Sequence, residues 1–360
     1  MIGIIGGYGD IGHHVVEVLL SMKNETLLIG ARNQKDMFYN YKSVMYQYVD
    51  LCDESSLEDF AKKCTVIINC SGLNECMTEK LLCKVQKYQC SYIEPQFNKS
   101  IKKQNGNTNA IVQGVGSMPG LSGVLPVFLS EKFQEVKGIK LYYIIGQGKF
   151  TPKSAKNFLD GMFDKDNLSM VRYEQGKVYP NFIKENELLP AFNKQYALLS
   201  YFDREAKEIC EFLSLEYAEF YIALENNLTY RVLRKAREKY KNNPGQTIED
   251  LCNASQIDSA KYGQCGFVVS VEGTIQNQEK FVTLILKADN ASLLTGLAIA
   301  SMANILTKER NRPNNHVLSM WQCQTYIPEL AKEILDSSGV YTEEYACSIE
   351  TLSEMEEGEI

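Results

Sequence analysis

The first twelve residues have the composition and spacing of a phosphate-binding turn. Residues 1–5 are apolar, a glycine-rich segment follows, and residues 13–22 place apolar side chains at helical spacing. The glycines fit two patterns, G-x-G-x-x-G and G-x-x-G-x-x-G, and both let the backbone approach a pyrophosphate at the positive N-terminus of a helix. A tight turn without a ligand is the alternative. The order strand, turn, helix favours a dinucleotide site made by Gly6, Gly7, Tyr8, Gly9, Asp10, Ile11 and Gly12.

The end of the next expected strand, residues 26–30, indicates which dinucleotide would bind. An NAD site carries Asp or Glu there, roughly 20 residues after the glycine turn, to hold the ribose hydroxyls. This chain has no acid at that point and continues with Arg32 and Asn33. A guanidinium can hold a 2′-phosphate with two hydrogen bonds. The sequence therefore favours NADP(H), and a solvated loop arginine is the alternative interpretation of Arg32.

Composition limits the class of protein and its partners. The chain has 360 residues, a length that predicts two domains. Its net charge is −7 and its Lys and Arg residues are dispersed, so we expect no surface that binds nucleic acid or a membrane. No run reaches the ~18 apolar residues of a membrane span, which predicts a cytoplasmic protein. The eleven cysteines show no metal-ligand spacing. We expect them to be small buried residues in a reducing compartment, with no metal.

The pattern of strands and helices divides the chain. Alternating strand and helix signals over residues 1–125 predict a doubly wound parallel sheet, with helices expected at residues 56–63, capped by Ser56, and at 75–88. Residues 126–299 change to hairpins and longer strands, which predict an α+β domain with a mostly antiparallel sheet and helices on one side. We expect residues 300–345 to return to the first domain and residues 346–360 to form a disordered acidic tail.

Within the second domain, two hairpins and one helical block are expected. The hairpins span residues 170–179 and 266–288, and the helical block runs from 204 to 240. The sequence Asn-Asn-Pro-Gly at residues 242–245 is expected to end that block.

Several of these stretches together resemble the saccharopine dehydrogenase-like reductases. The matching residues cover most of the N-terminal domain and part of the final hundred residues. They are Gly6 to Gly12, Gly30-Ala31-Arg32-Asn33, Asp50, Val66 to Gly72, Tyr92-Ile93-Glu94, Gly116 to Leu121 and Leu294-Thr295-Gly296. The resemblance implies a two-domain NADP-dependent oxidoreductase that reduces an imine or oxidises a secondary amine, acting on a small amino-acid-derived substrate. It also implies a cofactor role for Asp50 and a substrate role for Ser117.

Other candidate site residues follow from their positions. Cys70, Ser71 and Gly72 end the fourth expected strand, where the nicotinamide ribose would lie. Tyr92 and Glu94 end the fifth strand, two residues apart on one face, where a proton donor is wanted. Packing is the alternative role for Tyr92. Lys153 and Arg172 are candidates for binding a substrate carboxylate, and solvated surface charge is their alternative.

Three functions stay open at this stage. The first is an NADPH-dependent reductase of an amino-acid-derived imine. The second is a sensor that binds NADP(H) without turnover, because many relatives have Tyr-x-Asp before a small residue and glycine where this chain has Tyr92-Ile93-Glu94-Pro95-Gln96. The third is a reductase whose substrate is carrier-bound or a peptide. The sequence also leaves open whether the chain forms a homodimer.

Replacing Arg32 tests the choice of nucleotide. If its guanidinium holds the 2′-phosphate, Arg32→Ala weakens NADPH binding by about 1.5–3 kcal/mol, the range for hydrogen bonds to charged groups, and leaves NADH binding nearly unchanged. Fluorescence titration with both nucleotides measures this. Tighter binding of NADH than of NADPH by the unmutated chain would contradict it.

Overall fold

The computed structural model describes residues 1–22, 26–72, 75–98, 101, 109–146, 148–163, 168–192, 194–259, 264–308 and 317–358. The chain divides into two compact units, each made of two segments. The first unit comprises Met1–Val124 and Ser292–Ser337, and the second comprises Leu125–Ala291 and Ser338–Ile360. The segment that returns to the first unit therefore spans residues 292–337, whereas residues 300–345 were expected.

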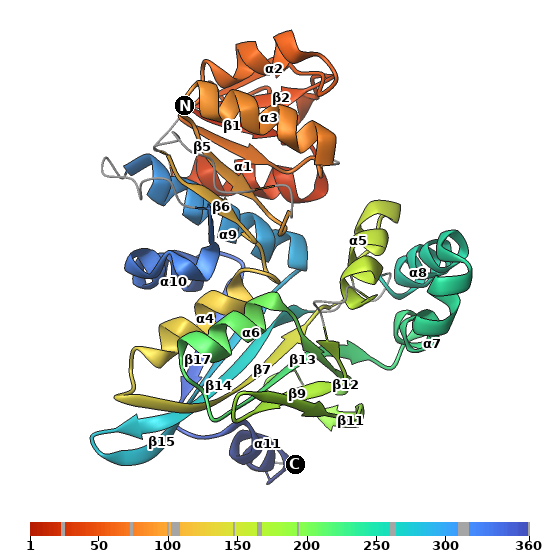
Figure 1. Cartoon of the computed structure of the whole chain (residues 1–360), viewed down its shortest axis with the longest axis vertical. Coiled ribbons are helices and arrows are strands. Elements are labelled where there is room, and N and C mark those ends of the chain that lie inside the picture. Colours follow the sequence, from red (N-terminus) through yellow and green to blue (C-terminus); the bar gives the residue numbers. More distant parts are fainter. Residues whose placement is uncertain are drawn as a thin grey trace. The chain divides into compact units, whose positions relative to one another are not determined.

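The first unit contains a seven-stranded sheet in which every pair of neighbouring strands is parallel (Figure 1). The strand order is β16-β6-β5-β4-β1-β2-β3, so the order reverses next to β1, as in a doubly wound dinucleotide-binding fold. This confirms the predicted fold class. The strands are β1 (Ile2–Ile5), β2 (Leu27–Ala31), β3 (Val44–Tyr48), β4 (Val66–Asn69), β5 (Ser91–Glu94), β6 (Ile111–Gln113) and β16 (Val317–Ser319).

The helices of the first unit include those expected at residues 13–22, 56–63 and 75–88. They are α1 (Asp10–Met22), α2 (Glu54–Ala61), α3 (Glu75–Lys87), α9 (Ala291–Lys308) and α10 (Ile327–Leu335), with α4 (Leu121–Ser130) at the junction of the units and 3-10 turns at Asp36–Phe38, Met320–Gln322 and Gln324–Tyr326. The expected cap of α2 was wrong. Asp53 caps it by accepting the Ser55 N–H at 2.9 Å, and Ser56 instead bonds to the backbone of Asp50. Asp is as strong a capping residue as Ser, which is why sequence alone misplaced the start by three residues.

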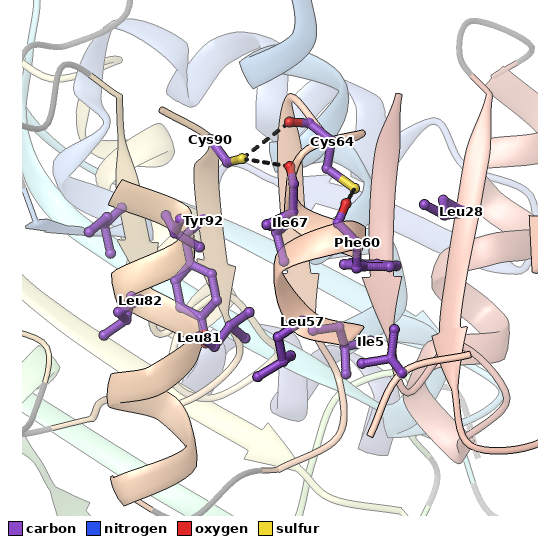
Figure 2. Close-up of a cluster of buried hydrophobic side chains, with 14 of the residues drawn as sticks. Ile5, Leu28, Leu57, Phe60, Cys64, Ile67, Leu81, Leu82, Cys90 and Tyr92 are labelled. Atoms are coloured by element: carbon purple, nitrogen blue, oxygen red, sulfur yellow. Dashed lines mark hydrogen bonds between the residues drawn. The ribbon is translucent and has the colours of Figure 1, made fainter. Parts of the chain in front are cut away.

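Phe60 of α2 is central to one core cluster of the first unit (Figure 2). Its ring is completely buried, and a Cβ at Gly3 or at Gly30 would come within 2.8 Å of it. Two neighbouring strands therefore carry glycine where the ring lies on the sheet. Aromatic rings bury large apolar areas, and the hollow left by these glycines lets the helix approach closely.

The cysteines are only partly the buried residues that the sequence predicts. All eleven are free, and Cys64 and Cys90 lie in the core, where each thiol donates to a backbone carbonyl (Figure 2). Cys52, Cys76 and Cys83 are exposed instead.

Helix α9 is the one helix of the described residues that is long and apolar enough to cross a membrane by length and composition. Of its apolar window, 72% is buried inside the structure, and core helices pass the same test. It packs on α1 so closely that a Cβ at Gly296 would come within 2.7 Å of the His14 Cβ.

The second unit is built on a ten-stranded mixed sheet, mostly antiparallel as predicted (Figure 1). Among the described strands, one parallel pair joins β13 to β7. The strands are β7 (Glu135–Ile144), β8 (Leu168–Ser169), β9 (Val171–Glu174), β10 (Lys177–Pro180), β11 (Lys184–Leu188), β12 (Gln195–Phe202), β13 (Tyr217–Glu225), β14 (Cys265–Ile275), β15 (Gln278–Ala288) and β17 (Val340–Tyr345). Both predicted hairpins are present, as β9–β10 and β14–β15.

The predicted helical block at residues 204–240 was wrong in its middle. The structure has α6 (Arg204–Phe212), then β13, then α7 (Leu228–Asn242). Strand β13 lies inside the sheet between β12 and β7 and is buried on both faces. It therefore lacks the alternation of polar and apolar residues that marks a half-exposed strand.

One further expectation about the second unit is confirmed and two were wrong. The helical block ends at residues 242–245 as expected, since α7 ends at Asn242, and a further helix, α8 (Pro244–Asp258), begins there because Asn243 caps it and Pro244 suits its first turn. The acidic tail is helical in α11 (Ile349–Gly358). Ile349 of this helix packs with Tyr142, Tyr221 and Val268 in a core cluster. Helix α6 lies on the other face of the sheet (Figure 1). Helices therefore cover both faces of the sheet, whereas one face was expected. The remaining helix is α5 (Pro152–Phe163).

The residues just before the tail also differ from the expected return. Strand β17 lies within the expected returning segment, yet it extends the edge of the second sheet by pairing with β15, from Thr283 opposite Tyr345 to Ala288 opposite Val340.

The burial of Phe60 makes a stability prediction. Phe60→Ala should lower the free energy of unfolding by about 3–5 kcal/mol, since it removes a fully buried ring between two strands and a helix. Tyr39→Ala is the control in the same unit, because that ring is 76% exposed and its loss should change stability by less than about 0.5 kcal/mol. Chemical denaturation followed by circular dichroism compares the two. Equal effects would contradict the assignment of Phe60 to the core.

Candidate functional site

The residues expected to bind the nucleotide follow the carboxyl ends of neighbouring parallel strands of the first unit. In doubly wound sheets ligands bind outside these ends, at the point where the strand order reverses. Here that point is the end of β1, between β2 and β4. The expected residues and the strands they follow are Gly6 to Gly12 (β1), Arg32 and Asn33 (β2), Asp50 (β3) and Cys70 to Gly72 (β4), while the expected proton donors Tyr92 and Glu94 lie within β5.

The glycine turn after β1 is held by close backbone contacts. Gly6 has φ +83°, and a Cβ there would come within 2.9 Å of the backbone of Cys70 and Ser71. A Cβ at Gly12 would come within 2.2 Å of the Gly6 carbonyl oxygen. Gly6 and Gly12 are thus required by the fold itself, because they bring α1 against the turn and the turn against the end of β4.

Gly9 differs from these two glycines. A Cβ at Gly9 would have one close neighbour, the Gly6 carbonyl oxygen at 3.2 Å. Its own backbone is part of the turn, since its N–H bonds the Gly6 carbonyl and its carbonyl accepts the His13 N–H. The protein therefore gives little internal reason for glycine at this position. A glycine backbone with only one close neighbour, at a helix N-terminus, has the form of a cradle for a pyrophosphate, so these residues fit a dinucleotide.

Tyr8 connects the glycine turn to the loop after β2. Its ring stacks on Phe38 at 6.2 Å, and its hydroxyl is hydrogen-bonded by the Lys35 backbone, although partial burial still raises the tyrosine pKa. Arg32 and Asn33, at the start of this loop, are exposed. The loop is therefore held beside the turn while its basic and amide side chains are left open to solvent.

A buried polar cluster joins the ends of β4 and β5. The Asn69 amide nitrogen donates to the Tyr92 hydroxyl at 3.1 Å and to Glu94 Oε2 at 2.9 Å. The Tyr92 hydroxyl in turn donates to Glu94 Oε2 at 2.5 Å. The side chains of Tyr92 and Glu94 thus lie on the same face of β5, as their spacing requires.

Burial separates the roles that Tyr92 and Glu94 can have. Tyr92 has no exposed surface and packs among the core residues Leu81 and Leu82 (Figure 2), whereas Glu94 retains 6%. Burial, followed by the charge of Glu94, raises the pKa of Tyr92 well above its usual value. Its hydroxyl is therefore a weak acid whose proton points to Glu94. The carboxylate is the better placed of the two to exchange a proton with a ligand.

The segment after β4 continues this cluster. The Asn69 amide oxygen accepts both the N–H of Ser71, at 3.1 Å, and its hydroxyl, at 2.6 Å. Gly72 has φ +58°. Burial, with a smaller contribution from Glu94, raises the pKa of the Cys70 thiol to about 12. Cys70 is thus a protonated thiol at neutral pH and not a nucleophile.

Asp50 organises its own turn. Its Oδ1 accepts the Cys52 N–H at 2.9 Å, and its backbone N–H donates to Ser56 Oγ at 3.0 Å. The turn lies after β3, on the same edge of the sheet as the glycine turn.

The three candidates for substrate binding are in different settings. Ser117 is buried in the first unit, where its hydroxyl lies 3.1 Å from the Thr295 hydroxyl of α9. Lys153 is exposed on α5. Arg172, on β9, is paired with Glu174 at 3.4 Å and lies over the Tyr179 ring. No contact within the described parts of the chain joins Lys153 to Arg172.

Histidine and acid groups also meet on the first turns of α1. His14 Nδ1 lies 3.3 Å from Glu17, and potential metal-binding atoms of His13, His14 and Glu17 all lie within 4.8 Å of one another. Burial, followed by the charge of His13, lowers the pKa of His14. Sequence reasoning did not identify this group, which consists of three residues from one helix.

Comparison with known proteins supports the interpretation of the first unit. Residues 2–83 match the model of the NAD dependent epimerase/dehydratase family, which is less than half of the chain. No curated protein sequence matches the chain. The apo saccharopine dehydrogenase (L-Glu forming) of Saccharomyces cerevisiae matches in structure with a TM-score of 0.67 and 11% identity over 96% of this chain and 99% of that one.

The chain has the fold of saccharopine dehydrogenase. This confirms, at the level of the fold, the resemblance noted in the sequence. An engineered D-amino acid dehydrogenase is more distant, with a TM-score of 0.48 and 13% identity over 91% of this chain and 95% of that one. A short-chain dehydrogenase/reductase of Veillonella parvula in complex with NADP aligns with only 26% of this chain and 46% of its own, at 12% identity and a TM-score of 0.24. The structural likeness shows the fold, and the family match covers the strands and helices around the glycine turn.

Asn69 is the site residue that sequence reasoning missed as a separate candidate. It is 1% exposed, and its amide connects Ser71, Tyr92 and Glu94. The signal was an amide side chain at the end of the otherwise apolar strand Val66–Asn69. A buried amide with four hydrogen-bonding positions needs polar neighbours, and these lie on the adjacent strand.

Two alanine substitutions separate the structural from the ligand-binding glycines. Within a helix, Gly→Ala normally stabilises the protein by about 1 kcal/mol. In Gly12→Ala the new Cβ would lie 2.2 Å from the Gly6 carbonyl oxygen, so we expect this variant to lower the free energy of unfolding by about 1–3 kcal/mol instead. Gly9→Ala should change stability by less than about 1 kcal/mol and weaken nucleotide binding at least roughly tenfold. Thermal unfolding and NADPH titration measure both. The larger Gly9→Val change should abolish binding in a folded protein, and retained binding would make the turn merely structural.

Proposed function

We propose that the protein is an NADPH-dependent oxidoreductase that reduces the C=N bond of a small amino-acid-derived imine. The observation that carries the proposal is the arrangement at one edge of the first sheet. There the glycine turn after β1 and the buried Asn69–Tyr92–Glu94 cluster at the ends of β4 and β5 lie at neighbouring strand ends.

The nucleotide would be held by the turn and by the loop beside it. Gly6 and Gly12 set the shape of the turn, Gly9 leaves room for the pyrophosphate, and the first N–H groups of α1 face it. Exposed Arg32 is available for a 2′-phosphate, with Asn33 beside it. The half-buried Asp50 turn and the Cys70–Gly72 segment complete this edge, near the ribose groups of the nucleotide.

The chemistry also needs a group that handles a proton. A reduced nicotinamide, when bound, supplies a hydride. The residues of the chain must keep the nitrogen of the C=N bond protonated, because an iminium accepts hydride more readily than an imine. Glu94 is suited to that task, since Asn69 and Tyr92 both donate hydrogen bonds to its Oε2 and so fix its orientation. In this proposal Tyr92 and Asn69 are positioning residues.

The class of substrate rests on the likeness to saccharopine dehydrogenase. The solved structure that shares the fold over nearly the whole chain is described as L-Glu forming. A related amino-acid-derived imine is therefore our proposed substrate. Ser117, Lys153 and Arg172 stay candidates for binding its polar groups, and a carrier-bound or peptide form of the substrate is compatible with the same chemistry.

A sensor that binds NADP(H) without turnover is the second candidate. The complete burial of Tyr92 and the hydrogen bond from its hydroxyl to Glu94 favour it, because a cluster satisfied within the protein can serve stability alone.

Turnover by variants of the cluster distinguishes these two functions. Glu94→Gln should slow NADPH oxidation in the presence of 2-oxo acids with amines by about 10²–10⁴-fold, because it removes the proton-carrying group. Tyr92→Phe, which removes only a hydrogen bond to that group, should cause a smaller loss. NADPH affinity should be unchanged in both variants. Stopped-flow absorbance at the NADPH band and fluorescence titration measure the two quantities.

Glu79→Gln on α3 is the matched control, because this glutamate is exposed in the same unit and should keep full activity. Absence of turnover in the folded, NADPH-loaded protein, with a conformational response to NADPH, would contradict the enzyme and support the sensor.

A further inference from the structure

The second unit carries a helical hairpin that the proposed chemistry does not use. Helices α7 and α8 run in opposite directions around the turn at Asn243 and pack with α5 (Figure 1). One side of α7 is anchored to the rest of the unit. Tyr240 donates to Asp160 of α5 at 2.6 Å, and Arg234 pairs with Glu185 at 3.1 Å.

The side of α7 that faces α8 borders an open groove. The groove has a volume of about 330 Å³, and four of the residues that line it are apolar. They include Leu228 and Ile257, which are 39% and 61% exposed, and the less exposed Val232 and Ala254. Exposed aliphatic side chains gathered in a concavity mark an interaction site more often than single exposed ones do.

The other feature of the groove is its charge. Arg231, Lys235 and Lys239 line it from α7, each four residues from the next and so on one face of the helix. Lys239 is paired with Asp250 across the groove at 3.7 Å. In the described parts of the chain no ion pair joins Arg231 or Lys235 to an acid. Helix α7 as a whole has six basic residues and one acidic residue, in a chain whose net charge is −7.

We propose that this α7–α8 groove docks an acidic amphipathic helix of a partner protein. The apolar residues of such a helix would cover Leu228, Val232 and Ile257, and its carboxylates would pair with Arg231 and Lys235. Helix-in-groove recognition requires an apolar stripe with charges along its border, and the groove presents both. The local charge is opposite in sign to that of the rest of the chain, so it would also orient an acidic partner toward this surface.

The same features argue against two other anionic partners. Single-stranded nucleic acid binds through stacking on aromatic rings, and none of the described residues that line the groove is aromatic. An anionic membrane is bound by helices that carry a whole apolar face, whereas only Leu228 and Ile257 of the groove are well exposed. An apolar floor with cationic borders is best matched by a helix that carries both kinds of side chain.

Binding of a designed peptide tests the proposal. The probe is a fluorescein-labelled helical peptide of about 20 residues, made of Leu, Ala and Glu with its Leu residues on one face. Its control has the same composition in scrambled order. We expect saturable binding of the amphipathic peptide to the full chain by fluorescence anisotropy, weakened as salt is raised, and much weaker binding of the scrambled peptide.

A matched pair of variants locates the binding. Lys235→Glu should weaken peptide binding by roughly five- to tenfold, whereas Lys241→Glu makes the same change of charge on the same helix outside the groove and should have little effect. Ile257→Ser should weaken binding without changing net charge. Thermal unfolding of each variant verifies that it is folded.

Three results would overturn the proposal. One is no binding of the amphipathic peptide at low salt, and another is equal loss in the Lys235 and Lys241 variants. The third is binding of duplex DNA, or of vesicles of equal phosphatidylserine and phosphatidylcholine, that exceeds peptide binding and is lost in Lys235→Glu.

Discussion

The first unit depends on a close approach of backbone to backbone at the end of β1. Gly6 lies against Cys70 and Ser71, and Gly12 lies against Gly6, with no space for a Cβ at either glycine. These contacts fix the start of α1, the turn before it and the end of β4 relative to one another. Side chains are flexible and could adjust, but backbone atoms in such contact cannot move without moving a whole element. The edge of the sheet therefore has a defined shape before any ligand is bound.

The side-chain amide of Asn69 connects this edge of the sheet to β5. Asn69 is the last residue of β4, next to the segment that touches Gly6, and it bonds both to Ser71 and to the Tyr92–Glu94 pair. A buried carboxylate is tolerated only where hydrogen bonds satisfy it, and here the donors come from two strands. The polar cluster and the glycine turn are thus parts of one continuous structure.

Sequence reasoning located most elements of the first unit because they have a local signal: a glycine turn, a short buried strand, or a helix with one apolar face. It did not find the three-residue strand β16, whose place is set by its pairing with β6. It identified Tyr92 and Glu94 but not the amide that joins them, since only the pairing of β4 with β5 brings residue 69 beside residues 92 and 94. In the second unit β13 was taken for helix because burial on both faces removes its alternation. The basic surface of α7 was also missed, because Lys and Arg are dispersed along the sequence as a whole. Arg231, Lys235 and Lys239 lie on one face only once the helix has formed.

The contact of Phe60 with Gly3 and Gly30 has a consequence for how this sequence can vary. The ring occupies a hollow that exists only because β1 and β2 both lack a side chain at the points beneath it. A methyl group on either strand collides with the ring, and a smaller residue on the helix leaves a void. Substitutions at these three positions, far apart in the chain, are therefore energetically coupled, and at Gly3 a Cβ would also have to displace the Cys64 thiol, 2.4 Å away.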